Sequence, residues 1–185
     1  MHETIDYAAE FTGHEWIGAA ATKRGLCWMA LGDSLDEVTA GIRAEFPAAH
    51  LHREPQVADW IKLAVNQIQP PAQTQTLVEI PTPVQGRVAE PSSLPVLDLR
   101  GTDFQLRVWK LIRAIPRGET RSYRELACAL GSPRSSRAIA SSCASNRIAL
   151  LIPCHRVIGS DGTLKGYRWG TERKRRLLEM ERASL

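Results

Sequence analysis

The sequence predicts an α+β fold of two modules, a small mixed module followed by a mostly helical one. The first part of the chain contains both short apolar segments and segments with helical periodicity. Residues 69–95 are rich in proline, and four predicted helices follow them. We place the modules at residues 1–95, which end in this Pro-rich connector, and at residues 96–185. Residues 1–99 carry 6 Lys and Arg against 13 Asp and Glu, and residues 100–185 carry 18 against 7. The net charges are therefore −7 and +11, and we expect the basic module to bind a polyanion. The alternative is that the Arg-rich half is only a well-solvated surface.

The first module begins with a predicted hairpin. The apolar segments Trp16–Ala21 and Leu26–Leu31 flank four turn residues. Ser34 and Glu37 form a capping box that opens a helix, and Pro47 ends it. The inward face of this helix is predicted to hold Leu35, Val38, Ile42 and Phe46.

A second helix is predicted to begin near Pro55, because proline suits the first helical position. Its core-facing stripe follows the i, i+3, i+4 pattern and comprises Val57, Trp60, Ile61, Ala64, Val65 and Ile68. The prolines of the connector preclude a regular helix there, so Thr76–Ile80 is its single candidate strand. Val96–Leu99 is predicted as a last short strand before the second module.

The second module is predicted to be mostly helical. Thr102 caps a first helix, whose inward side chains are Phe104, Val108, Leu111, Ile112 and Ile115. Ser122 caps a second helix over Tyr123–Leu130. After a Gly-containing turn, Pro133 begins a third that runs to about Ser145. Two short helices joined in this way resemble helix-turn-helix geometry, although many helical corners share that pattern.

Composition narrows the class of protein. No apolar run approaches the length of a membrane span, and the acidic N-terminus lacks the order of a signal peptide, so we expect a cytoplasmic protein without membrane contact. The cysteines lie far apart and lack zinc-ligand spacing, which argues against a disulfide scaffold or a metal site. Each is then a small core residue or a reactive thiol: Cys27, Cys128, Cys143 and Cys154.

Cys154 is the candidate nucleophile, because it is the cysteine with His155 and Arg156 beside it. Such neighbours favour the thiolate, which is the reactive form of cysteine. If the segment is extended, Cys154 and His155 point to opposite sides and need a bridging water or a bend. The alternative is that this Cys-His pair is structural.

Glu181 is the candidate partner of His155. In a final helix from about Thr171, it shares one face with Leu177 and Leu178, and a carboxylate on an inward face needs a partner. A His155–Glu181 contact would orient the imidazole. The alternative is that Glu181 frays at the chain end.

The third helix of the second module has an unusually smooth surface. Small residues surround Arg137, namely Ala138, Ala140, Ser141, Ser142, Ala144 and Ser145. This surface would allow close approach to DNA, with Arg137 filling the gap left by an extruded base. The alternative is a helix packed on its own domain, and we expect Ile139 and Cys143 to face the core.

The chain resembles a known family at these residues. The segment Pro153-Cys154-His155-Arg156, which follows Asn146–Ile152, is similar to the active-site signature of the O6-alkylguanine-DNA alkyltransferases. The similarity covers nearly all of residues 96–182, most closely to Ada-type bacterial members, and is looser over residues 5–68. It implies a ribonuclease-H-like N-terminal subdomain and a helical subdomain with a helix-turn-helix that enters the minor groove.

The resemblance also implies site residues. The chemistry falls to Cys154, His155, Glu181, Tyr123 and Asn146. The DNA contacts fall to Tyr123, Arg124, Arg137 and Ser160. The guanine pocket falls to Pro153, Tyr167 and Arg168.

In this family pattern Cys154 accepts the alkyl group, activated through a water, His155 and Glu181. Asn146 is the hinge between the DNA-binding helix and the active-site segment. Tyr123 rotates the nucleotide and protonates the leaving guanine. Arg124 stands where glutamine is common. Nothing resembles the zinc module of Ada, so a regulatory role is not supported, and the retained Cys154 distinguishes the chain from lesion-recognising relatives with tryptophan there.

The implied activity is repair of alkylated double-stranded DNA by a monomer without cofactor or metal. The methyl group of O6-methylguanine, and more weakly that of O4-methylthymine, would move to Cys154 once per molecule. Two other hypotheses are a non-catalytic module that marks lesions and a cysteine hydrolase that uses Cys154 and His155.

Overall fold

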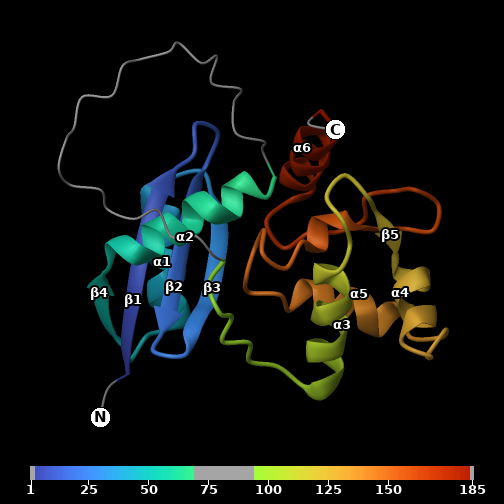
Figure 1. Ribbon diagram of the computed structural model, residues 1–185, viewed down its shortest axis with the longest axis horizontal. Helices are drawn as coiled ribbons and strands as arrows, with labels where there is room; N and C mark the ends of the chain where they lie inside the picture. The colour runs from blue at the N-terminus through green and yellow to red at the C-terminus, as the bar shows by residue number, and fades with distance from the viewer. Residues whose placement is uncertain (1–2, 69–93, 184–185) are drawn as a thin grey trace, which may run out of the picture.

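A computed structural model describes residues 3–68 and 94–183 (Figure 1). The Pro-rich connector, with its candidate strand Thr76–Ile80, lies outside these residues except at its last two positions. Both expected modules contain regular structure, a sheet with two helices and a group of helices (Figure 1). The mixed α+β class predicted from the sequence is therefore confirmed.

The first module is built on a four-stranded sheet in the order β3-β2-β1-β4. The predicted hairpin is confirmed as β2 (Trp16–Thr22) and β3 (Gly25–Gly32), which pair antiparallel. β1 (Thr4–Phe11) pairs antiparallel with β2 and parallel with the edge strand β4 (His50–Arg53). Neither β1 nor β4 was predicted.

Helices α1 (Leu35–Glu45) and α2 (Pro55–Asn66) cover opposite faces of this sheet. Successive residues of β2 point to opposite faces of the sheet and so show which helix covers each face. Ala20 packs in one cluster with Ile42 of α1. Its neighbours Ala19 and Ala21 pack in the other cluster with Ile61 of α2. The predicted stripe of α2 is therefore confirmed as core-facing.

Two details of α1 differ from the prediction. Leu35 is 44% exposed, because the first residue of the helix lies ahead of the turn that reaches the sheet. The Ser34 side chain accepts a hydrogen bond from Glu37 N as expected. The carboxylate of Glu37, however, accepts from Asp33 N rather than from Ser34 N, which shifts the capping box by one residue.

The second module contains α3 (Asp103–Arg113), α4 (Tyr123–Ala129), α5 (Ser136–Ala144) and α6 (Thr171–Arg182). Complete capping boxes open α3 and α4, at Thr102 with Gln105 and at Ser122 with Glu125. The helix α5 starts three residues after Pro133, which lies in the preceding turn. Two short strands, β5 (Arg121–Ser122) and β6 (Val157–Ile158), pair in parallel.

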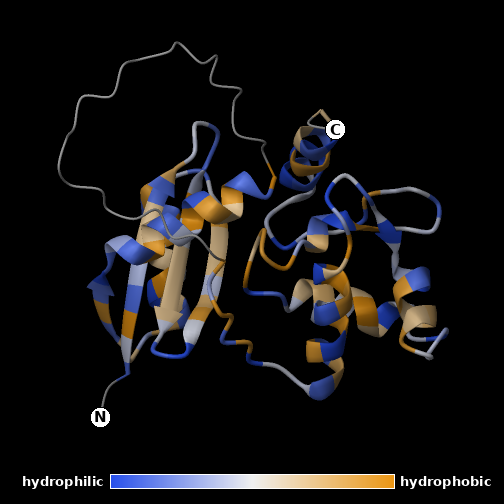
Figure 2. Cartoon of the chain, viewed as in Figure 1, coloured by the Kyte–Doolittle hydropathy of each residue, from blue (hydrophilic) through white to orange (hydrophobic). Residues whose placement is uncertain are grey.

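The two modules share one hydrophobic cluster. It joins residues of β2, β3 and α2 to α3, α5 and the segment before Cys154; Figure 2 shows tan and orange along β2 and β3. The predicted strand Val96–Leu99 is reduced to a single bridge between Leu97 and Leu26. There the carbonyl of Val96 approaches so closely that a Cβ on Gly25 would lie 2.2 Å from it.

A second bridge joins β3 to the segment that precedes Cys154. Met29 N donates to Arg147 O at 2.8 Å, and Ala149 N donates to Met29 O at 2.9 Å. The first module therefore holds the backbone that precedes Cys154 in place through β3. Among the described helices, none has the length and apolar content needed to cross a bilayer.

Candidate active site

Cys154 lies in a tight turn and not in an extended segment. Cys154–Arg156 forms a 3₁₀ helix, in which Arg156 N donates to Pro153 O at 2.9 Å. Leu150 has a positive φ of 63°, so the chain already turns sharply before the cysteine. The condition of an extended segment is therefore not met, and the bend that the sequence analysis gave as the alternative to a bridging water is present. Cys154 is 4% exposed.

Asn146 holds this turn in place. Its buried carboxamide donates from Nδ2 to Ile152 O at 2.9 Å and to Cys154 Sγ at 3.2 Å. Its Oδ1 accepts from Ile148 N at 2.9 Å. One side chain therefore connects the end of α5 to three points of the segment that carries the cysteine, as the hinge expectation requires.

The predicted contact between His155 and Glu181 is present, with Nε2 of His155 2.8 Å from Oε1 of Glu181. Both side chains are fully buried, so Glu181 does not fray. Arg156 also donates to Glu181, from Nε at 3.1 Å and from Nη2 at 2.8 Å, and Gly118 N donates at 3.1 Å. The role of Arg156 as a second partner of Glu181 was missed, although Arg156 is adjacent to His155.

The charges of this group follow from burial and hydrogen bonding. Burial alone would raise the pKa of Glu181, but the hydrogen bonds from His155 and Arg156 hold it at about 2. Burial lowers the pKa of His155, Arg156 and Lys174 act in the same direction, and together these effects outweigh Glu181, which raises it. The resting pair is therefore a carboxylate and a neutral imidazole.

The resting sulfur of Cys154 is a thiol. Burial raises the pKa of Cys154 well above its ordinary value, and the neighbouring thiol of Cys143 adds to that effect. Asn146 and Lys174 act in the opposite direction and are weaker. The expectation that His155 and Arg156 favour the thiolate therefore does not hold for the resting site, because desolvation dominates.

Lys174 is a site residue that the sequence analysis missed. It is fully buried, and Nζ donates to Val157 O at 2.6 Å and to Gly166 O at 3.4 Å. Burial lowers its pKa to about 8, although Cys143 and Cys154 act to raise it. The alternative of a solvated Arg-rich surface does not apply to Lys174, because it lies three and four residues before Leu177 and Leu178, on the inward face of α6.

Cys154 lines a hollow of about 560 Å³. The structure brings four of the predicted residues to its wall, namely Tyr123, Arg137, Tyr167 and Arg168. Burial raises the pKa of Tyr123 to about 12, so this phenol keeps its proton at neutral pH. The hollow has the size of a small-ligand site.

The loop at Tyr167 and Arg168 closes one side of this hollow. Arg168 Nη1 donates to Ala144 O at 3.1 Å, which ties the loop to the end of α5. The ring of Tyr167 lies edge-on to His155, with centroids 6.4 Å apart. Its buried hydroxyl has no hydrogen-bond partner among the described residues.

Three predicted residues lie elsewhere. Pro153 is buried and lines a different hollow with Leu151 and Arg156. Its assignment to the guanine pocket stays a prediction. Arg124 and Ser160 are exposed and line a third hollow, beside Ile158 and outside the one that holds Cys154.

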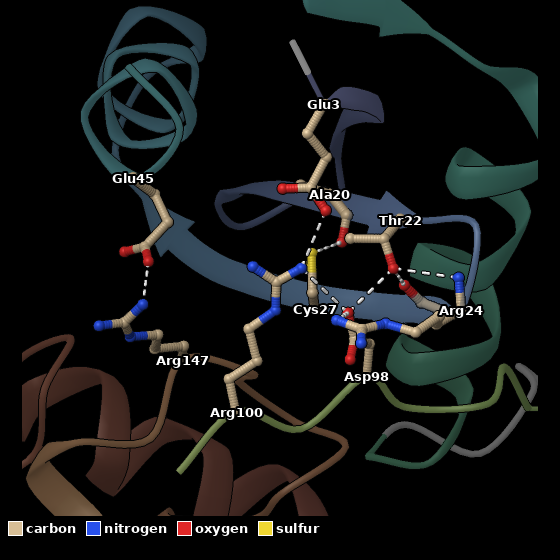
Figure 3. A network of polar contacts seen from close by, with 10 residues as sticks. Glu3, Ala20, Thr22, Arg24, Cys27, Glu45, Asp98, Arg100 and Arg147 are labelled. Carbon is tan, nitrogen blue, oxygen red and sulfur yellow. Dashed lines mark hydrogen bonds and ion pairs between the residues drawn. The ribbon is translucent and has the colours of Figure 1, made fainter. Parts of the chain in front are cut away.

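A further hollow, of about 340 Å³, lies between the modules behind Asn146. Figure 3 shows the ionic network at this place. Arg100 Nη2 donates to Glu3 at 3.0 Å and to Asp98 at 3.2 Å, and Arg147 pairs with Glu45 of α1. These contacts fix the modules relative to each other on the side of the site that faces away from Cys154.

Comparison with known proteins agrees with this geometry. The family model of the DNA-binding domain of 6-O-methylguanine DNA methyltransferase matches residues 103–183. A crystal structure of Mycobacterium tuberculosis OGT in complex with DNA is 31% identical, with a TM-score of 0.69, and the match covers 97% of this chain and 94% of that one. The chain therefore belongs to the 6-O-methylguanine DNA methyltransferase family.

Two curated relatives extend the comparison. The bifunctional transcriptional activator/DNA repair enzyme Ada of Escherichia coli is 43% identical over 162 residues, which are 88% of this chain and 41% of Ada. A methylated-DNA–protein-cysteine methyltransferase of Mycobacterium tuberculosis is 56% identical over 87 residues, which are 47% of this chain and 53% of that protein. The chain thus matches about half or less of the length of these relatives.

Proposed function

We propose that this protein repairs alkylated DNA by moving the methyl group of O6-methylguanine, and more weakly that of O4-methylthymine, onto Cys154 Sγ in a single turnover. The observation that carries the proposal is the sulfur of Cys154 in the wall of a hollow that Tyr123, Arg137 and Tyr167 also line. The related methyltransferases named above support the same reaction.

The proposed reaction is a displacement at the methyl carbon. The sulfur of Cys154 forms a bond to carbon, the carbon–oxygen bond breaks, and its electron pair stays on the guanine, which takes a proton from Tyr123. The thiol proton leaves towards neutral His155, whose other nitrogen is engaged by Glu181. Because the turn gives no direct Cys154–His155 hydrogen bond among the described contacts, this transfer requires a bridging water.

The substrate base must leave the duplex to reach the sulfur. Arg137 is exposed at the rim of the hollow, where it would fill the space of the extruded nucleotide. Tyr167 and Arg168 would close over the guanine. Asn146 would hold the sulfur of Cys154 in position while α5 contacts the DNA.

We further propose that α4 and α5 form a helix-turn-helix that enters the minor groove. Ala138 and Ser141 on α5 are exposed and small, which suits close approach to a groove. Arg124 and Ser160 would contact the backbone from the neighbouring hollow. We also propose that the two domains divide between residues 95 and 96, that the first is a ribonuclease-H-like subdomain, and that the protein is a monomer.

The direct test is incubation with duplex DNA that contains O6-methylguanine, followed by mass spectrometry of the protein. We expect a gain of one methyl group per chain on the peptide that holds Cys154, and none in Cys154→Ser. Cys27→Ala is the matched control, because Cys27 is also buried but lies behind Asn146. Methylation of another residue, or repeated turnover per chain, contradicts the proposal.

Two measurements separate this function from the other hypotheses. A cysteine hydrolase would turn over small esters without DNA. A lesion-marking module would bind the methylated duplex equally well in Cys154→Ser and would leave the lesion unrepaired in both proteins. DNA binding by the basic module should weaken steeply with salt, because bound lysines and arginines release counterions from the phosphates.

A further inference from the structure

The loop that closes the hollow, residues 165–170 and called the pocket loop below, contacts α6 as well as α5. Tyr167 and Arg168 of this loop line the hollow that holds the reactive cysteine. Arg173, in the first turn of α6, donates from Nη1 to the carbonyl oxygen of Trp169 at 3.0 Å. The pocket loop is therefore fixed at its end as well as through the contact of Arg168 with α5.

The other two nitrogens of Arg173 contact the first module. Nε donates to the carboxylate of Glu15 at 2.9 Å, and Nη2 donates to the carboxylate of Asp33 at 2.5 Å. Glu15 lies in the turn between β1 and β2, and Asp33 follows β3, so both acceptors lie at the same end of the sheet. One guanidinium group thus joins the pocket loop to the sheet through all three of its nitrogens.

Glu15 is a buried carboxylate that lies between two arginines of α6. Its side chain is 6% exposed, and that of Arg173 is 16% exposed. Arg176 Nη2 also pairs with Glu15, at 2.8 Å, but from a more exposed side chain. Removing one partner of a buried ion pair is costly, whereas exposed pairs contribute little. Glu15 and Arg173 therefore fix each other's position, while the exposed Asp33 adds little.

Ring packing connects Trp169 to the hollow. Trp169 is buried, and its ring lies edge-on to that of Tyr167, with centroids 5.2 Å apart. Gly170 N donates to Tyr167 O at 3.1 Å, so the backbone joins the same residues. Tyr167 in turn lies edge-on to His155 and lines the hollow beside Cys154. A shift of the Trp169 backbone would therefore move the ring that forms this wall.

We propose that Arg173 is a positioning residue, which is held by Glu15 and keeps Tyr167 of the pocket loop in the wall of the hollow. The inference rests on the proposed function, because that position matters for the reaction only if a base enters the hollow. It gives the first module a part in methyl transfer, although none of its described residues lines the hollow. A misplacement of about 1 Å can slow a reaction by about 100-fold, so such a contact affects the rate without touching the reacting atoms.

The test compares Arg173→Met with Arg176→Met. Each change removes one arginine from Glu15 and leaves the other, so both proteins should fold, but of the two only Arg173 has a described contact with the pocket loop. Single-turnover methyl transfer is measured over a range of concentrations of duplex DNA with O6-methylguanine, per folded chain counted by circular dichroism. In Arg173→Met we expect the rate at saturating DNA to fall by about 10- to 100-fold at an unchanged half-saturating concentration. Arg176→Met should keep the full rate.

Hydrogen exchange gives a readout that does not depend on methyl transfer. Exchange at Gly170 N, which donates to Tyr167 O, should become faster in Arg173→Met and not in Arg176→Met, in the absence of DNA. If the unchanged protein transfers no methyl group, the proposed function fails and the exchange experiment alone decides the coupling.

Two outcomes overturn the inference. One is a transfer rate or an exchange rate in Arg173→Met equal to that of the unchanged protein. The other is an equal effect of both variants, which would indicate a general loss of stability. If Arg173→Met does not fold, Arg173→Lys takes its place, because it keeps the charge beside Glu15 but lacks the planar fork that reaches three acceptors.

Discussion

Replacing Glu181 by glutamine removes the negative charge that balances buried Arg156, and the structure gives its cost. Glu181 and His155 are fully buried, and Arg156 is 7% exposed. Glutamine keeps the shape of the side chain, but only its oxygen can accept a hydrogen bond, so the contacts of one carboxylate oxygen with Arg156 or Gly118 N are lost together with the charge. The change therefore tests the charged, accepting carboxylate rather than the packing.

The magnitude follows from the pKa of Glu181, which falls from an ordinary value of 4.5 to about 2. At about 1.4 kcal/mol for each unit of pKa, the charged carboxylate stabilises the folded protein by about 3 kcal/mol. Breaking a buried ion pair by removing one partner costs about 3–5 kcal/mol, which agrees. In a chain of this length, 3 kcal/mol lowers Tm by about 10 °C.

The pH dependence gives a sharper test than the stability at one pH. Because folding lowers the pKa of Glu181, its contribution is complete above pH 4.5 and is lost as pH falls towards 2. The difference between the two proteins in urea denaturation should thus be full at pH 7 and shrink below pH 4.5. Glu179→Gln, on the exposed face of α6, is the matched control. Equal stability at pH 7, or a difference that does not change with pH, would refute the reasoning.

Three further changes test other parts of the site. Asn146→Ala leaves Ile152 O without its buried donor and removes the hydrogen bond to the Cys154 sulfur. We expect the free energy of unfolding, measured in urea, to fall by about 2–4 kcal/mol and methyl transfer to become slower. Unchanged stability would contradict the hinge role. Folding lowers the pKa of Lys174 from 10.5 to about 8, so between these pH values the unfolded chain binds more protons than the folded protein and the free energy of unfolding should rise with pH. The rise, measured from urea midpoints, should be smaller in Lys174→Met. An equal rise in both proteins would count against a lowered pKa of Lys174. Tyr123→Phe should slow single-turnover methyl transfer by about 100-fold without loss of DNA binding, and an unaltered rate would exclude Tyr123 as the proton donor.

The elements that the sequence predicted are those governed by local rules. The caps at Thr102 and Ser122 depend on residues three positions apart, and the burial of Glu181 follows from helical periodicity with Leu177. The residues that define each of these patterns lie within two turns of one helix. The caps are therefore contained in the local sequence, and so is the inward position of Glu181, although its partners His155 and Arg156 are distant in the chain.

The missed elements depend on partners far away in the chain. β4 has a single partly buried apolar residue, Leu51, and is a strand because it pairs with Thr4–Tyr7 of β1. The turn at Cys154 depends on Asn146, whose three hydrogen bonds span the segment between them. Lys174 lies among arginines, so composition suggested a solvated surface while the helix face placed it in the core. In all three cases tertiary contacts overrode the local signal.

The burial of Cys154 and its proposed reactivity are compatible once the resting and reacting states are distinguished. A protonated, desolvated sulfur is a poor nucleophile towards electrophiles in solution, which would protect a residue that is proposed to act once. The activating groups are already in place, because Asn146 donates to the sulfur and Lys174 is buried nearby. What the resting site lacks is the reacting base itself. In the proposed reaction, methyl transfer would depend on the entry of a flipped nucleotide into the hollow. Selectivity for DNA would then come from the approach of α5 and Arg137 rather than from an intrinsically activated thiolate.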